Sequence, residues 1–239
     1  MVDLATVTSW ELGKCFDQSV LPKNTTEEDI REGARIAVKY NCAAFYSSST
    51  YWTSVVLEEL EGTDILPAAA IAFPFGSATS LVKVKEAEEA VSLGCRALDM
   101  VMNIGALKSG RSDDVRRECR EFKDAAGDAL TKVILETCFL DDDEIRRGSE
   151  IVAEEGIDYV KTSSGQFEGP SMEHVLIMLD AVAETPTKVK VAGVKFPRPQ
   201  NAYAFLLAGA DLIGTRDAPT IIDALEQMRG IGLVPTYRG

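Results

Sequence analysis

Two lysines and one aspartate lie in segments of the sequence that are apolar enough to be buried. Asp99, Lys161 and Lys195 lie in, or at the ends of, short apolar runs rich in β-branched residues. Burying a charge in such a run costs free energy unless the charge is paired or takes part in a reaction. These three side chains are therefore the first candidates for chemistry in the chain.

Paired lysines favour one kind of reaction, the attack of an amine on a carbonyl. The amine must be neutral, and at an ordinary pKa of about 10.4 only about one lysine in 10³ is neutral at pH 7. A second ammonium about 4 Å away opposes protonation by about 4 kcal/mol at an effective dielectric near 20, and desolvation acts in the same direction. Lys161 and Lys195 are 34 residues apart, the length of one strand–helix–strand unit. The spacing therefore predicts neighbouring strands, Schiff-base chemistry at Lys161, and Asp99 as a partner in proton transfer.

Other interpretations of these residues stay open. The two lysines can extend from strand ends into solvent while Asp99 pairs with one of them. An isomerase or epimerase can use acid–base chemistry at Asp99, which leaves Lys161 without a role. A barrel that binds a metabolite without catalysis is a further alternative.

Regular alternation of short apolar runs with amphipathic stretches predicts the elements that hold these residues. Strands are predicted at 14–18, 43–47, 67–73, 97–102, 132–137, 159–162, 189–195 and 211–215, and helices at 27–40, 81–93, 113–126, 141–155 and 201–208. Eight units without a linker favour one α/β domain, a (β/α)8 barrel over residues 1–239 with an irregular tail at 230–239. A doubly wound sheet is the alternative, but no Gly-x-Gly-x-x-Gly motif follows the first strand.

Details of these elements carry two further expectations. Thr25 is predicted to cap the first long helix, with Glu28 as its capping-box partner. In such barrels the chemistry lies at the carboxyl ends of the strands. Asp99 falls on the fourth predicted strand, Lys161 ends the sixth and Lys195 ends the seventh.

Composition excludes several classes of protein. A net charge of −13 disfavours binding to nucleic acid or to anionic membranes, and no apolar run is long enough to cross a bilayer. Residues 1–14 show no signal-peptide pattern. The five cysteines are scattered, which is typical of reduced thiols in a cytoplasmic protein. With His174 as the single histidine, a multi-histidine zinc site is excluded, and we expect no metal or cofactor.

Longer runs around the candidate residues resemble the deoxyribose-phosphate aldolase family. The matching segments are 97–110 (ALDMVMNIGALKSG), 132–137 (KVILET) and 159–165 (YVKTSSG). Asp17, followed by TTEEDI at 25–30, resembles the family's first strand and helix, and FPFG at 73–76 resembles the end of its third strand. The resemblance covers nearly the whole chain.

The resemblance implies a metal-free class I aldolase, a lyase of carbohydrate catabolism built on a (β/α)8 barrel. Lys161 would form the Schiff base, Lys195 would lower its pKa, and Asp99 would relay protons. The expected reaction is the reversible cleavage of 2-deoxyribose 5-phosphate, or a related sugar phosphate, into acetaldehyde and glyceraldehyde 3-phosphate, by a homo-oligomer. Substrate-binding residues implied by the matching segments are Asp17, Lys132, Thr162, Ser163 and Gly165.

Two loops depart from the family pattern at the expected phosphate site. After the seventh-strand lysine the family has small residues and Gly-Gly, whereas Lys195 is followed by FPRP; after the eighth strand, Gly-Thr-Ser-Ser-Gly is replaced by GTRDA. The second-strand end, FYSSS at 45–49, also differs. Arg198 and Arg216 are predicted to bind an anionic group of the substrate. That anionic group is a phosphate or, for a carboxylated sugar-like substrate, a carboxylate. The alternatives are solvent-exposed arginines, or an Asp217–Arg216 pair that neutralises Arg216 and suits an unphosphorylated, uncharged sugar.

Overall fold

A closed barrel of eight parallel strands forms the centre of the molecule. The computed structural model describes residues 2–47 and 49–239, so Ser48, in the altered segment after the second strand, lies outside the described residues. The strands follow one another around the barrel in chain order, and β8 pairs with β1 to close it. Their bounds are β1 (Phe16–Ser19), β2 (Ala44–Tyr46), β3 (Leu66–Ile71), β4 (Ala97–Val101), β5 (Leu130–Ile134), β6 (Tyr159–Lys161), β7 (Lys188–Ala192) and β8 (Leu212–Thr215). The predicted (β/α)8 barrel is thus confirmed.

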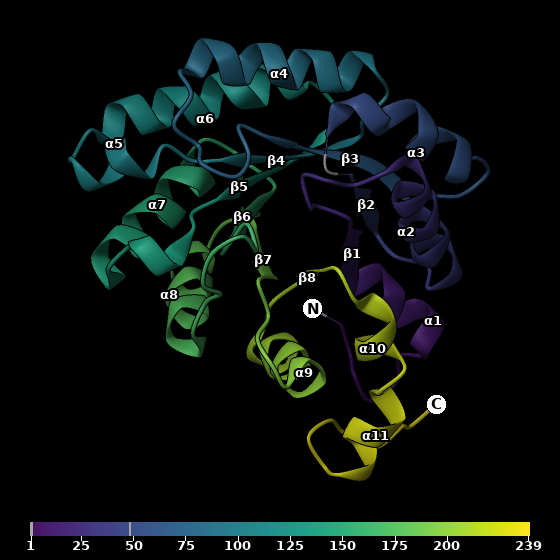
Figure 1. Cartoon of the computed structure of the whole chain (residues 1–239). Helices are drawn as coiled ribbons and strands as arrows, with labels where there is room; N and C mark the ends of the chain where they lie inside the picture. The colour runs from purple at the N-terminus through teal and green to yellow at the C-terminus, as the bar shows by residue number, and fades with distance from the viewer. Residues whose placement is uncertain (1, 48) are drawn as a thin grey trace.

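Helices surround the strands on the outside (Figure 1). Their bounds are α1 (Ser9–Leu12), α2 (Glu27–Lys39), α3 (Thr53–Glu59), α4 (Ser80–Ser92), α5 (Ile104–Lys108), α6 (Ser112–Ala126), α7 (Asp142–Glu154), α8 (Met172–Val182), α9 (Arg198–Ala208), α10 (Ala218–Ile222) and α11 (Leu225–Gly230). After α11, residues 231–239 form no helix or strand. All five predicted helices are present, at α2, α4, α6, α7 and α9.

The cap of α2 lies one residue later than predicted. Thr26, not Thr25, accepts the hydrogen bond from the backbone of Asp29, and the Asp29 carboxylate in turn accepts one from the Thr26 backbone. Thr25 instead donates its hydroxyl to the carbonyl of Pro22. Both registers satisfy the capping-box pattern, so only the turn before the helix, which places Thr25, decides between them.

Two layers of side chains build the interior. Alternate residues of each strand face opposite sides, so on β4 Leu98 and Met100 pack outward against the helices while Asp99 faces the barrel axis. Inside the barrel a small apolar cluster consists of Ala44, Tyr46, Ala68 and Ala97. Its three alanines are short, which leaves room along the axis for longer side chains. The barrel interior can therefore hold the lysines that the sequence places on β5, β6 and β7.

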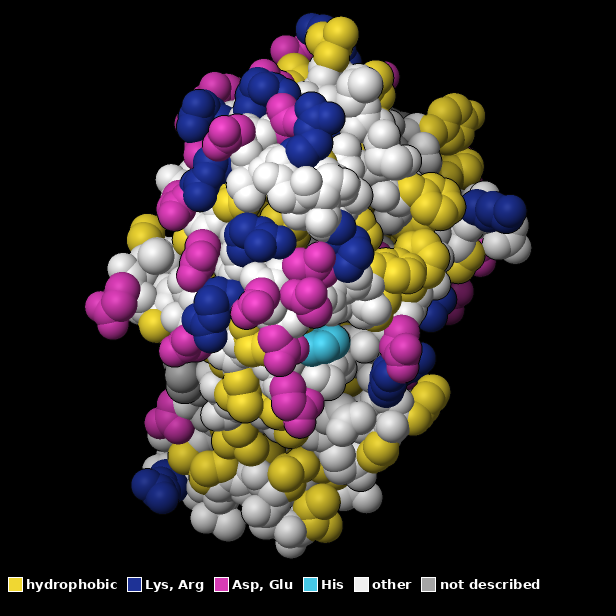
Figure 2. All heavy atoms as spheres, turned by 90° about the vertical axis from the view of Figure 1, so that its left-hand side faces the viewer, with side chains coloured by type: hydrophobic (Ala, Val, Ile, Leu, Met, Phe, Trp, Pro, Cys, Tyr) yellow, Lys and Arg dark blue, Asp and Glu magenta, His cyan; other side chains and the backbone are white. Residues whose placement is uncertain are grey.

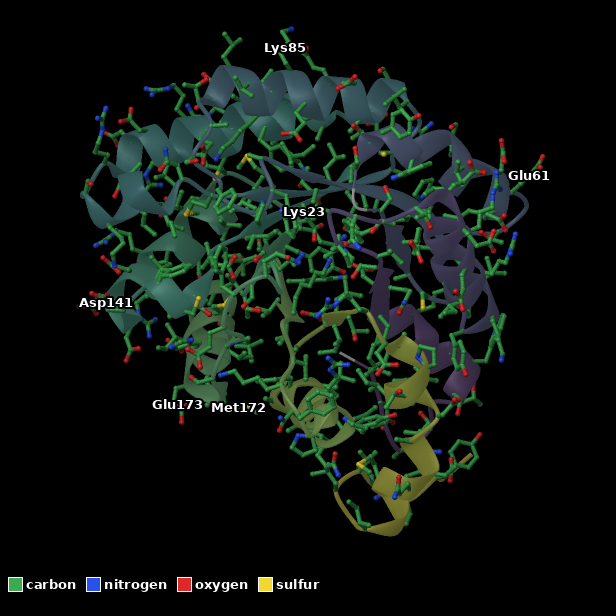
Figure 3. The ribbon with its side chains drawn as sticks, viewed as in Figure 1. Lys23, Glu61, Lys85, Asp141, Met172 and Glu173 are labelled. Carbon is green, nitrogen blue, oxygen red and sulfur yellow. The ribbon has the colours of Figure 1, made fainter. Side chains whose placement is uncertain are left out.

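Charged side chains of both signs lie among hydrophobic and other side chains on the face of the molecule that Figure 2 shows. The labelled Glu61, Lys85, Asp141 and Glu173 lie on the outside of the helical layer (Figure 3). The single histidine, His174, belongs to α8 and its ring nitrogen Nδ1 lies 3.2 Å from the hydroxyl of Thr137. Among the described residues, no helix is both long and apolar enough to span a membrane.

Candidate active site

Five charged side chains from five strands meet inside the barrel. They are Asp17 on β1, Asp99 on β4, Lys132 on β5, Lys161 on β6 and Lys190 on β7, and each is at most 7% exposed. Ion pairs are needed at such depth, because an isolated buried charge is expensive. We call these five residues the charge cluster.

Asp99 lies at the centre of the charge cluster. Its Oδ2 atom is 2.7 Å from the Nζ atom of Lys161 and 2.8 Å from that of Lys190. Its Oδ1 atom accepts a hydrogen bond of 2.5 Å from the hydroxyl of Tyr46. Lys132 Nζ is farther away, 3.6 Å from Oδ1. One carboxylate thus holds two amines at one oxygen and a phenol at the other.

The second lysine beside Lys161 is Lys190, not Lys195, and this corrects the prediction made from the sequence. Strand β7 ends at Ala192, so Lys195 lies in the following loop, where its exposed side chain pairs with Glu168 at 2.6 Å. Lys190 lies opposite Lys161 in the register of the β6–β7 pair. The prediction extended the seventh strand through 191–195 because that run is largely apolar, but a turn at Gly193, with a φ of 71°, ends it earlier.

The environments of the two lysines push their pKa values apart. Burial, the largest effect, and the neighbouring ammonium of Lys190 lower the pKa of Lys161 to about 8, although Asp99 opposes them. Burial also acts to lower the pKa of Lys190, but the carboxylates of Asp17, at 2.6 Å, and Asp99 outweigh it and raise the pKa. Lys190 therefore stays an ammonium, while Lys161 is the amine that can lose its proton near neutral pH.

Charge balance in the cluster favours one neutral amine. Burial acts to raise the pKa of Asp99, but Lys161, Lys190 and Lys132 together hold it well below its usual range, so this carboxyl stays ionised. With Asp17 and Asp99 as anions, three ammonium groups would leave one buried positive charge in excess. A neutral Lys161 removes that excess, because Lys132 and Lys190 then match the two carboxylates.

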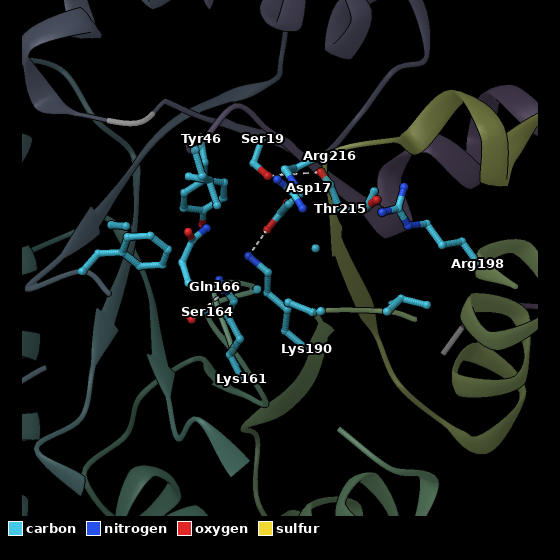
Figure 4. A pocket seen from close by; sticks show the side chains of 18 residues that line it. Asp17, Ser19, Tyr46, Lys161, Ser164, Gln166, Lys190, Arg198, Thr215 and Arg216 are labelled. Atoms are coloured by element: carbon cyan, nitrogen blue, oxygen red, sulfur yellow. Dashed lines mark hydrogen bonds and ion pairs between the residues drawn. The ribbon is translucent and has the colours of Figure 1, made fainter. Parts of the chain in front are cut away.

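A cavity opens above the charge cluster at the carboxyl ends of the strands. Its volume of about 70 Å³ is enough for a few water molecules, and its lining includes Asp17, Tyr46, Lys161 and Lys190 (Figure 4). Figure 4 shows the amine of Lys190 directed toward the carboxylate of Asp17. Gly214 of β8 gives this lysine its space, since a Cβ there would lie 3.1 Å from the Lys190 Cε atom. Lys161 thus lies at the boundary between a buried ion network and a solvent-accessible space.

Several predicted substrate-binding residues lie outside the lining of this cavity. Lys132 is fully buried and donates a hydrogen bond of 2.8 Å to the hydroxyl of Tyr46. The hydroxyl of Thr162 donates to the carbonyl of Ala192 and accepts from its N–H group, which ties β6 to β7. Ser163 is fully buried as well. These three residues are buried beside the cavity and do not line it.

Residues that do line the cavity include Asp17 and Gly165, as predicted, together with Ser164 and Gln166. The backbone N–H of Ser164 donates to the buried carboxylate of Glu136 at 3.0 Å. Burial raises the pKa of Glu136. The hydrogen bond to Glu136 therefore fixes the segment after β6 that lines the cavity.

Both predicted arginines line the cavity, but they differ in their ion pairing (Figure 4). Arg198, the first residue of α9, pairs with Asp217 at 3.3 Å and stacks on the ring of Phe196. Arg216 is exposed and forms no ion pair within residues 2–47 and 49–239. The alternative pairing of Asp217 with Arg216 is thus wrong, since Asp217 takes Arg198 instead.

Gln18 holds the loop that carries Arg216. Its side-chain amide donates to the carbonyl of Arg216 and accepts from the N–H of Ala218, both at 3.1 Å. Ser19 donates to the carbonyl of Thr215. Strand β1 therefore fixes the β8 loop from the side, and the sequence carries no local signal for this contact, since nearly 200 residues separate the partners.

Sequence reasoning missed Lys190 and Tyr46. Lys190 had a local signal, since Val189 and Val191 flank it in an alternating strand pattern in which residue 190 faces the barrel interior. When the family pattern is aligned on Lys190 instead of Lys195, the residues that follow the lysine are Val191, Ala192 and Gly193. With that alignment this strand end departs less from the family pattern. Tyr46 had no comparable signal, since a tyrosine at a strand end is ordinary in any barrel.

Comparisons with known proteins agree with this geometry. A model of the DeoC/LacD family of aldolases matches residues 13–197. Deoxyribose-phosphate aldolase of Clostridium novyi is 38% identical over 89% of this chain and 95% of its own, and that of Streptococcus mutans is 36% identical over 92% and 99%. The structure of the deoxyribose phosphate aldolase of Aeropyrum pernix has a TM-score of 0.81 at 27% identity and covers 92% of this chain and 93% of its own.

The match to the family extends over β1 to β7 and includes every residue of the charge cluster. The same family is therefore indicated by the barrel fold, by the two lysines paired with an ionised aspartate, and by the relatives. The chain belongs to the DeoC/LacD aldolase family, and it is a lyase, a class I aldolase that resembles deoxyribose-phosphate aldolase.

Proposed function

We propose that this aldolase cleaves 2-deoxy-D-ribose 5-phosphate, or a closely related sugar phosphate, reversibly through a Schiff base on Lys161. The observation that carries the proposal is the pair of amines on one carboxylate oxygen, in which Lys161 has the lower proton affinity and borders the cavity. Lys190 keeps its charge and opposes protonation of Lys161, and Asp99 balances the charge of both.

The chemistry then follows from the state of Lys161. Its neutral Nζ atom attacks the aldehyde carbon of the open-chain sugar, and loss of water leaves a cationic iminium. The C3 hydroxyl loses its proton, the C2–C3 bond breaks, and its electron pair moves into the iminium to give an enamine and free glyceraldehyde 3-phosphate. Protonation of the enamine carbon and hydrolysis release acetaldehyde. The Asp99 carboxylate, 2.7 Å from this nitrogen, stabilises the iminium while it is charged.

Arg216 and Arg198, which also line the cavity, support recognition of an anionic group. Hydrogen bonds to a charged group are worth about 1.5–3 kcal/mol. Arg216 is available for such a bond, whereas Arg198 first has to leave Asp217. An unphosphorylated, uncharged sugar-like substrate is the second candidate, and the partial neutralisation of Arg198 by Asp217 is the observation in its favour.

Borohydride trapping tests the proposal. Acetaldehyde with borohydride is expected to add one ethyl group to the peptide that contains Lys161, because reduction of the iminium fixes the donor carbons on nitrogen. Label on Lys190 instead would reverse the two roles. A protein that takes no label, yet is folded by circular dichroism, would contradict the Schiff-base mechanism.

Assembly and location are separate proposals. The aldolase of Aeropyrum pernix is described as a tetramer, which supports a homo-oligomer here, and light scattering of the purified protein tests it. The five cysteines are free thiols, three of them buried, which supports a cytoplasmic location. Fractionation of the source cells tests that location.

A further inference from the structure

Tyr46 contacts four of the five members of the charge cluster. Its side chain is 4% exposed and lines the floor of the cavity. The hydroxyl donates to Asp99 Oδ1 at 2.5 Å and accepts from Lys132 Nζ at 2.8 Å. A tyrosine that only filled space would not need both bonds, and alanines fill the neighbouring interior positions.

The ring of Tyr46 discriminates between the two amines on Asp99. Lys190 Nζ lies 4.4 Å from the ring centroid, and Lys161 Nζ lies 5.7 Å from it. An aromatic ring stabilises a cation over its face, and the attraction weakens with distance. The ring therefore favours the charged form of Lys190 over that of Lys161.

The hydroxyl of Tyr46 acts in the same direction through Asp99. The partial positive charge on the donated hydroxyl hydrogen offsets part of the carboxylate's negative charge, so the carboxylate attracts other cations less strongly. Among the described residues, Asp99 is the one carboxylate within ion-pair distance of Lys161, whereas Lys190 also has Asp17 at 2.6 Å. A smaller effective negative charge on Asp99 therefore lowers the proton affinity of Lys161 more than that of Lys190.

From these contacts we propose that Tyr46 is a positioning residue. Of the two amines on Asp99, it favours protonation of Lys190 and leaves Lys161 as the neutral nucleophile. The proposal rests on the proposed Schiff-base function, and it adds a residue on β2 to the control of that reaction. Groups that face Lys161 from the other strands are Asp17 (β1), Asp99 (β4), Lys190 (β7) and, after β5, Glu136. All of these remain when the Tyr46 hydroxyl is removed.

The experiment measures the pH at which Schiff-base trapping by acetaldehyde and borohydride reaches half its maximal initial rate. In the unchanged protein this midpoint is expected near 8, the pKa of Lys161. Tyr46→Phe removes the hydroxyl and keeps the ring, and the midpoint is expected to rise by about one pH unit, which lowers trapping at pH 7 about tenfold. Tyr46→Leu removes both, and a larger rise is expected.

Tyr159→Phe is the matched control. Tyr159 lies on β6 with its ring 5.5 Å from Lys132 Nζ, but no hydrogen bond to Asp99 is formed by its hydroxyl among the described residues. Its midpoint is expected to stay at the value of the unchanged protein. An unchanged or lower midpoint in Tyr46→Phe, or an equal rise in Tyr159→Phe, overturns the proposal.

Failure of this proposal is distinguishable from failure of the proposed function. If Lys161 is labelled but the midpoint does not move in Tyr46→Phe, only the proposed role of Tyr46 is overturned. If Lys161 is not labelled in the unchanged protein, the Schiff-base mechanism itself is contradicted. Tyr46→Phe keeps the ring and its packing, so it serves alone if Tyr46→Leu does not fold. Reductive methylation at pH 8 is the second measurement. Less methylation of Lys161 in Tyr46→Phe than in the unchanged protein supports the role of Tyr46, and equal methylation overturns it.

Discussion

Replacement of Lys190 by methionine tests the activation of Lys161 most directly. Both amines contact the same oxygen, at 2.7 and 2.8 Å, so their nitrogens are at most about 5.5 Å apart. At an effective dielectric near 20, two unit charges at that distance repel by about 3 kcal/mol, which corresponds to about two pKa units. Without Lys190, the pKa of Lys161 should rise from about 8 toward its ordinary value.

The expected loss of activity follows from the neutral fraction of Lys161. At pH 7 that fraction is about one tenth for a pKa near 8, and it falls about 100-fold when the pKa rises by two units. Lys190→Met is therefore expected to lower kcat/KM for 2-deoxyribose 5-phosphate about 100-fold at pH 7. Part of the activity should return as the pH is raised toward 10, because the remaining amine then loses its proton.

Lys195→Met is the matched control, since it removes the lysine that the sequence alone pairs with Lys161. Its side chain is 53% exposed and pairs with Glu168 on the surface, and such pairs contribute at most about 1 kcal/mol. We expect less than about a twofold change in kcat/KM. A large loss in Lys195→Met, or a Lys190→Met protein that is folded and fully active at pH 7, would refute the reasoning.

Three further predictions concern pH, metals and the anionic group. In the unchanged protein the rate of Schiff-base formation should rise about tenfold per pH unit below 8 and level off above it, because the neutral amine reacts; a flat profile between pH 6 and 8 contradicts this. Activity should survive exhaustive EDTA treatment, and a loss that a divalent metal restores would contradict the class I assignment. Arg216→Ala should lower kcat/KM about 10- to 150-fold for a phosphorylated substrate and spare its unphosphorylated counterpart, whereas equal losses would make the arginine structural.

The sequence predicts the barrel well because hydrophobic periodicity reports alternation and burial directly. The eight predicted apolar runs correspond to eight strands, and Asp99 and Lys161 occupy the strand positions that were predicted for them. Strand ends are harder to predict, because an apolar residue in a loop looks like an apolar residue in a strand. That ambiguity, over 193–195, placed the second lysine five residues too late.

Contacts across the barrel could not be predicted from the sequence. The hydroxyl of Tyr46 reaches Asp99 over 53 residues of chain, and Gln18 reaches Ala218 over 200. Neither contact leaves a local pattern, since both depend on strand register and on the closure between β1 and β8. The same holds for Arg198 and Asp217, whose pairing depends on where α9 and the β8 loop meet.

The charge cluster and the two arginines lie in different parts of the chain. Every member of the charge cluster lies within residues 13–197, the part that the family model covers, whereas Arg198, Arg216 and Asp217 lie beyond it. If the arginines bind the anionic group as proposed, the loop after β8 can diverge while Gly214 on β8 itself keeps the space that Lys190 needs. Exchange of the β8 loop between relatives is thus a route to new acceptor preferences on an unchanged reaction centre.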